Sequence, residues 1–66
     1  MEKLRIKELR EEKGMTQAQL GTELGLDQRS ISGYETGRKQ PSIDTIKKMC
    51  KIFEVTAGYL LGIEDY

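Results

Sequence analysis

The sequence contains no histidine, and it has only one cysteine and one proline among its 66 residues. The lack of histidine excludes His-based catalytic triads and removes the commonest metal ligand. The single cysteine, Cys50, excludes an internal disulfide and a cysteine-based zinc site, and it is typical of a protein from a reducing, cytoplasmic environment. Nothing in the sequence therefore indicates a metal ion, a cofactor or a small-molecule ligand.

Long hydrophobic runs are also absent. No apolar run approaches the roughly 20 residues that a membrane span needs, and Met1 is followed by charged residues rather than by a signal-peptide core. A chain of 66 residues buries only about 60% of its unfolded surface when it folds, which leaves little room for a deep substrate cleft. We expect a single domain, residues 1–66, that lies in the cytoplasm and binds a partner through its surface.

The chain has no net charge, since 11 basic side chains balance 11 acidic ones, whereas many nucleic-acid-binding proteins are basic. The charges are unevenly distributed, however. Residues 1–27 carry five basic and six acidic groups. Residues 28–51 carry six basic groups and two acidic ones, and residues 52–66 carry three acidic groups and no basic one. The basic middle segment can attract phosphate to one face of a neutral molecule.

Glycine, proline and helix-capping residues divide the sequence into short segments with helical periodicity. No segment shows the alternation of apolar and polar residues that is typical of a strand. Thr16 and Gln19 form a capping box, while Asp27, Ser42 and Thr56 are good N-caps for later helices. The sequence therefore predicts a compact all-α domain of five helices. The expected helices cover about residues 3–13, 17–24, 28–36, 43–53 and 57–61.

Helical spacing also predicts which side chains point inward. In the first helix, Ile6 and Leu9 share one face. Cys50 lies on the inward face of the fourth helix, where a small buried hydrophobe is a better interpretation than a redox switch. The apolar residues expected to stack with it are Ile43, Ile46, Met49 and Phe53.

Only Gly25, Leu26 and Asp27 separate the second helix from the third, which is the geometry of a helix-turn-helix. Gly25 permits the positive φ that a sharp turn requires. Gly21 is expected where the third helix crosses the second closely. The motif is placed at about residues 17–36.

The third helix has an outward face without apolar side chains. Ile31 and Tyr34 point inward with Ser30, so the remaining positions point outward. Glutamine and arginine can form paired hydrogen bonds with adenine and guanine respectively, serine adapts to several bases, and glycine permits close backbone approach. Taken alone, this face is equally compatible with an ordinary solvated surface. Its residues are Gln28, Arg29, Ser32 and Gly33.

Several runs resemble the phage-repressor-like helix-turn-helix family (Cro, lambda repressor, XRE). They are TQAQLG at 16–21, LGL at 24–26, SISGYETGR at 30–38 and PS at 41–42. The Leu9–Arg10 pair and the segments 53–56 and 59–62 also match, so the resemblance covers about residues 4–62. It implies a five-helix, lambda-repressor-like domain that binds double-stranded DNA as a homodimer, with the third helix in the major groove.

The resemblance also implies roles for individual residues. Arg10 and Glu35 would form a structural ion pair between the first and third helices, and Gln17 would brace Gln28. The expected base-contacting residues are Gln28, Arg29, Ser32 and Gly33. The expected DNA-backbone contacts are Thr16, Gln17, Arg38 and Lys39.

Apolar residues near the C-terminus are more numerous than one short helix can bury, and a two-fold interface needs such a surface. We expect the dimer interface at Tyr59, Leu61 and Ile63, together with Tyr66. The lysines at 47, 48 and 51 are interpreted as a solvated row rather than as an extension of the DNA footprint.

The leading functional hypothesis is a sequence-specific transcriptional regulator, a repressor that occludes a pseudo-palindromic operator as a dimer. The alternative is a protein-interaction module, antitoxin-like or an anti-regulator partner, in which DNA binding is secondary; the zero net charge favours it. A gel shift against random duplex, with and without cell extract, distinguishes the two. An enzyme is not expected, because the sequence offers no nucleophile–base pair, metal cluster or phosphate-cradling loop.

Overall fold

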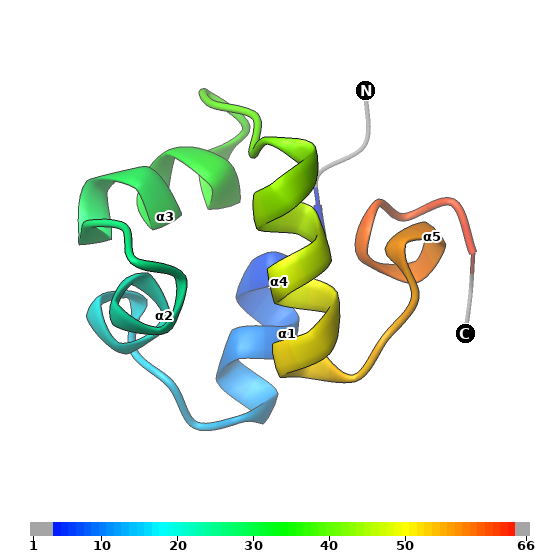
Figure 1. The fold of residues 1–66 in the computed structure, drawn as a ribbon, viewed down its shortest axis with the longest axis horizontal. Coiled ribbons are helices and arrows are strands. Elements are labelled where there is room, and N and C mark those ends of the chain that lie inside the picture. Colours follow the sequence, from blue (N-terminus) through cyan, green and yellow to red (C-terminus); the bar gives the residue numbers. More distant parts are fainter. Residues whose placement is uncertain (1–3, 65–66) are drawn as a thin grey trace.

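The computed structural model describes residues 4–64 and places five helices and no strand within them. This confirms the predicted all-α, five-helix architecture (Figure 1). The first helix is shorter than expected. It begins after Arg5, which makes no side-chain capping bond, and residue 3 of the predicted segment lies outside the described range. The helices are α1 Ile6–Glu12, α2 Gln17–Leu24, α3 Gln28–Thr36, α4 Ile43–Phe53 and α5 Ala57–Leu60.

The four helices after α1 each begin at a residue whose side-chain oxygen accepts a backbone N–H. Thr16 accepts from the Gln19 amide at 3.0 Å, and the Gln19 side chain accepts from the Thr16 amide at 2.8 Å, which completes the predicted capping box. The side chains of Asp27, Ser42 and Thr56 cap the next three helices in the same way. Local hydrogen bonding therefore fixes where these helices start.

A single hydrophobic core holds the helices together. Its buried members are Ile6, Leu9, Leu20, Leu24, Ile31, Tyr34, Met49, Phe53 and Leu60. The prediction that Ile43 belongs to this core is wrong, because 73% of the residue is exposed. Ile43 occupies the first position of α4, where the chain arrives from the loop 37–42, and the inward face of α4 starts one turn later at Ile46. Cys50 is half-buried beside the core, and burial raises the pKa of its thiol.

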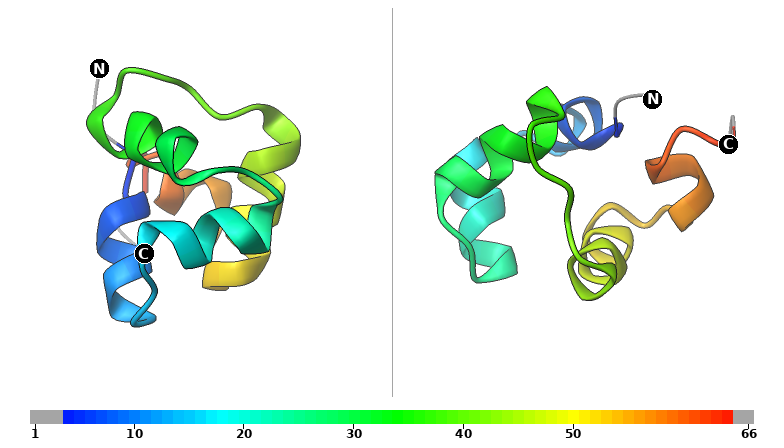
Figure 2. Two further views of the ribbon diagram at one scale, coloured as in Figure 1. Left: turned by 90° about the vertical axis from the view of Figure 1, so that its left-hand side faces the viewer. Right: turned by 90° about the horizontal axis from the view of Figure 1, so that it is seen from above.

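The arrangement of the helices separates two ends of the molecule. In Figure 1, α2 and α3 lie together at one end of the long axis, α1 and α4 lie in the middle, and α5 lies at the opposite end. Figure 2 shows the α2–α3 end facing the viewer, with the loop after α3 passing over that helix towards α4. No helix among residues 4–64 combines the length and apolar character needed to cross a membrane.

Candidate nucleic-acid interface

The turn between α2 and α3 sets the angle at which the two helices meet. Gly25 adopts the left-handed conformation, with φ +71°, and the Leu26 amide donates back to the Gly21 carbonyl at 2.7 Å. A methyl carbon at Gly21 would lie 2.7 Å from the Leu26 carbonyl oxygen. The expected close approach at Gly21 is therefore present, but the backbone that it meets belongs to the turn and not to α3.

One side of α3 faces the core and the other is polar. Ile31 and Tyr34 are buried, as predicted, whereas Gln28 and Arg29 are exposed and Ser32 is half-buried. We call Gln28, Arg29 and Ser32 the polar face of α3. Together with Gln17 and Asp27, this face lines a shallow, open hollow. A hollow this open to solvent differs from the enclosed pockets that bind small ligands.

The placement of Gly33 on the exposed side of α3 is wrong. Gly33 is buried, and the carbons that cover it belong to the side chain of Lys39. The amide of Lys39 also donates to the Gly33 carbonyl at 3.1 Å. The loop after α3 thus folds back onto this position, which the helical periodicity of α3 alone does not reveal.

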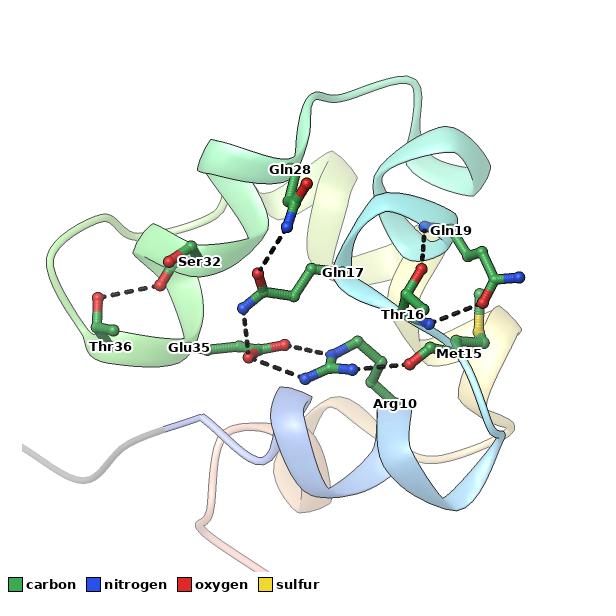
Figure 3. Close-up of polar contacts among 9 residues, drawn as sticks. All are labelled: Arg10, Met15, Thr16, Gln17, Gln19, Gln28, Ser32, Glu35 and Thr36. Carbon is green, nitrogen blue, oxygen red and sulfur yellow. Dashed lines mark hydrogen bonds and ion pairs between the residues drawn. The ribbon is translucent and has the colours of Figure 1, made fainter.

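A chain of hydrogen bonds runs from the core to the polar face of α3 (Figure 3). The Arg10 Nε donates to Glu35 Oε2 at 2.6 Å. The Glu35 Oε1 accepts from the Gln17 Nε2 at 3.0 Å. The Gln17 Oε1 accepts in turn from the Gln28 Nε2 at 3.3 Å. The bracing of Gln28 by Gln17 is present as expected, while the bond between Gln17 and Glu35 was not anticipated from the sequence.

The direction of this chain follows from chemistry. An ionised carboxylate only accepts hydrogen bonds, so Glu35 must face the amide N–H groups of Gln17. The carbonyl oxygen of Gln17 then faces Gln28 and accepts one of its N–H groups. Gln28 keeps one N–H donor and its carbonyl acceptor for an outside partner. The buried carboxylate of Glu35 therefore determines the orientation of the Gln28 amide.

The Arg10–Glu35 ion pair predicted between α1 and α3 is confirmed. The side chains of Arg10 and Glu35 are only 11% and 5% exposed. The guanidinium makes a second bond to Glu35 at 3.3 Å, and its third nitrogen donates to the Met15 carbonyl at 2.7 Å. Hydrogen bonding to Glu35 raises the pKa of Arg10, so the buried group stays charged. The pair ties α1, α3 and the start of α2 into one unit.

The residues expected to contact a DNA backbone come from two separate segments of the chain. Thr16 and Gln17 stand at the beginning of α2, while Arg38 and Lys39 lie in the loop after α3. Thr16, Arg38 and Lys39 are exposed and Gln17 is half-buried. The fold brings one residue of each segment to α3, because Gln17 bonds to Gln28 and Lys39 packs against Gly33.

Asp27 is the acidic residue of this surface, and its carboxylate caps α3. The hydrogen bond from the Ser30 amide lowers the pKa of Asp27 below its ordinary value of 3.8, and the charges of Arg29 and Lys39 act in the same direction. A lowered pKa stabilises the fold above the pKa of the unfolded chain, and this contribution is lost as the pH falls through the folded value. We expect an NMR titration to place the Asp27 pKa below 3.8. Asp27→Asn should keep the cap and lose this pH dependence, and an Asp27 titrating at or above that value would contradict the capping role.

The residues expected at a dimer interface lie at the α5 end of the molecule. Ile63 is 77% exposed, whereas Tyr59 and Leu61 are half-buried; Tyr66 lies outside the described residues. The guanidinium of Arg5 lies 4.3 Å from the centre of the Tyr59 ring, and the Arg5 amide donates to the Leu60 carbonyl at 2.9 Å. This cation–π contact between the start of α1 and α5 has no signal in the sequence, because it depends on tertiary packing.

The comparisons with known proteins agree on helix-turn-helix regulators and structures of the same fold. The helix-turn-helix family model matches residues 6–60. An uncharacterized HTH-type transcriptional regulator, YobD of Bacillus subtilis (strain 168), is 31% identical over 61 residues, which is 92% of this chain and 54% of YobD. This chain therefore spans about half of the length of YobD.

Two solved structures are similar to this chain over most of their length. The P22 c2 repressor in complex with a synthetic operator has a TM-score of 0.84 at 27% identity, with 91% of both chains covered. The restriction-modification controller protein C.AhdI from Aeromonas hydrophila has a TM-score of 0.75 at 32% identity, with 85% of this chain and 81% of that chain covered.

Proposed function

The chain belongs to the helix-turn-helix family, and from this premise we propose that it is a sequence-specific, double-stranded DNA-binding transcriptional regulator that acts as a repressor. The family is one of DNA-binding regulators and not of enzymes. The observation that carries the proposal is the polar face of α3. On this face, Gln28 is held by a hydrogen bond to Gln17, and Gln17 is held in turn by a hydrogen bond to Glu35. The P22 c2 repressor, which has the same fold, is bound to a synthetic operator.

In the proposed mechanism, one set of residues positions the protein on the DNA backbone and another set recognises the bases. Phosphate contacts from the start of α2 and from Arg38 and Lys39 fix the register of the protein on the duplex. The polar face of α3 then enters the major groove. Gln28, with one donor and one acceptor available, matches the major-groove edge of adenine, and Arg29 matches that of guanine. A repressor of this kind works by occluding its site.

We expect Arg29→Ala to weaken specific binding by about 1–3 kcal/mol and to relax the preference at one base pair. Lys39→Ala should weaken binding to all sequences alike, because a phosphate carries no sequence information. Lys47→Ala on α4 removes the same charge from a solvated row and serves as the matched control. Binding isotherms on the preferred duplex and on a random duplex measure all three. Equal losses on both duplexes for Arg29→Ala and Lys39→Ala would contradict the assigned roles.

We also propose a homodimer that contacts two half-sites of a pseudo-palindromic operator, about 34 Å apart. The α5 end is suited to the two-fold contact, because Ile63 is exposed there and the polar face of α3 lies at the opposite end of the molecule (Figure 1). Leu61→Lys is expected to shift the sedimentation behaviour from dimer to monomer, since a charge at a desolvated contact is unfavourable. A dimer that persists unchanged in Leu61→Lys would place the interface elsewhere.

Selection of bound sequences from a random duplex pool tests the proposed function as a whole. We expect an enriched sequence with two-fold symmetry, and binding that weakens with salt by a slope of about 0.9 per phosphate contact. The alternative, a protein-interaction module, makes the opposite forecast: no enrichment from the pool, and a shift of duplex mobility only after cell extract is added.

A further inference from the structure

Gly33 of α3 and Lys39 of the following loop pack against each other. A β-carbon at Gly33 would lie 2.8, 3.0 and 3.2 Å from the Cδ, Cγ and Cβ of Lys39. Three consecutive carbons of the lysine stem therefore occupy the space that any other residue at position 33 would fill. The Lys39 amide bonds to the Gly33 carbonyl at 3.1 Å, so backbone and side chain are held at the same point.

We propose that Gly33 is a positioning residue for Lys39 and not a base-contacting residue. Lysine has a long stem with many rotamers, and packing that stem against an apolar surface restricts where its charged end can go. At Gly33 the bare helix backbone provides the surface. In this proposal the stem, held against α3 at Gly33, directs the ammonium group to the border of the polar face, where a phosphate would lie. This inference rests on the proposed DNA-binding function.

A second observation agrees with this placement. The charge of Lys39 contributes to lowering the pKa of Asp27, which caps the beginning of α3. This is the weakest of the causes that lower the Asp27 pKa, and it agrees with a lysine side chain that packs against α3 at Gly33.

The proposal predicts that a side chain at position 33 displaces the lysine without breaking the fold. The Cδ and Cγ of Lys39 belong to a flexible side chain and can move away from a methyl group, whereas the Cβ at 3.2 Å requires the loop to shift by a few tenths of an ångström. Alanine is also a better helix former than glycine. The gain in helix propensity and the cost of this shift oppose each other, so Gly33→Ala should fold with a Tm close to that of the wild type, while Lys39 loses its fixed direction.

The test compares four proteins, the wild type, Gly33→Ala, Lys39→Met and the double variant, on the duplex selected from the random pool. Lys39→Met keeps an apolar stem and removes the charge. We expect Gly33→Ala to reduce the slope of log affinity against log salt by about 0.9, which corresponds to about an eightfold loss at 0.1 M salt. The preferred base sequence should not change. Adding Gly33→Ala to Lys39→Met should cause no further loss, because the contact is already gone.

Each other result overturns the proposal in a recognisable way. A wild-type slope in Gly33→Ala would show that Lys39 does not depend on Gly33. A changed preference at one base pair would place Gly33 against a base. Additive losses in the double variant would show that the two residues act separately. If the wild type itself enriches no sequence and shows no salt-dependent binding, the proposed function fails, and this inference fails with it.

Discussion

Replacing Glu35 with alanine is expected to lower the free energy of unfolding by about 3–5 kcal/mol, because the variant leaves the Arg10 guanidinium buried without its counter-charge. Only 9% of Arg10 is exposed, so water cannot take the place of the carboxylate. The free energy of unfolding of a domain this small is about 3–10 kcal/mol in total. The substitution should therefore remove about a third or more of the stability, with loss of the hydrogen bond that orients Gln17.

Urea unfolding followed by circular dichroism measures this effect, and the chain offers a matched control. Lys13 and Glu54 form an ion pair at 3.2 Å with side chains that are 41% and 80% exposed. Lys13→Ala should cost no more than about 1 kcal/mol. The double variant Arg10→Met/Glu35→Leu should be more stable than either single variant, since it removes both charges. If Glu35→Ala costs no more than Lys13→Ala, the buried pair does not support the fold.

Gly21→Leu should also destabilise the protein strongly, by roughly 3 kcal/mol, at the upper end of the range for overpacking. The side chain would meet the Leu26 carbonyl oxygen and the Asp27 backbone, and backbone cannot move aside as a flexible side chain can. The turn would have to open, and α3 would leave its position against α2. Because α3 carries the polar face, DNA affinity should fall together with stability.

Gly33→Ala is the comparison for this substitution, with a smaller side chain added at a second buried helical glycine. Both glycines lie inside helices and both are buried, but the neighbour of Gly33 is the flexible stem of Lys39. Thermal unfolding should show a marked loss of Tm for Gly21→Leu and none for Gly33→Ala. Equal losses for the two variants would mean that the turn does not set the packing of α2 against α3.

The features that the sequence predicts well are those with local causes. Thr16, Asp27, Ser42 and Thr56 begin helices because each offers an oxygen to an amide three residues later, and this depends on neighbouring residues only. Gly25 ends α2 for an equally local reason, its positive φ. The ion pair between Arg10 and Glu35 was predicted across 25 residues only through the resemblance to a family, since no local pattern connects them.

The features that the sequence does not predict depend on where loops return. Helical periodicity places Ile43 inward, but α4 has not yet reached the core at its first residue. The same periodicity places Gly33 outward, yet the loop after α3 folds back and covers it with Lys39. The Arg5–Tyr59 contact joins the two ends of the chain and is visible only in three dimensions. Periodicity describes one helix at a time and carries no information on these neighbours.

Amide NMR spectra recorded while the selected duplex is added locate the DNA-binding surface most directly. We predict that the largest shifts fall at the beginning of α2 and on the polar face of α3, at Gln17, Gln28 and Arg29, with smaller shifts at Arg38 and Lys39. Random duplex should shift the residues that contact the backbone and leave Gln28 and Arg29 nearly unchanged. Shifts confined to α5, or to the lysines of α4, with a silent α3 would contradict the proposal that α3 reads DNA.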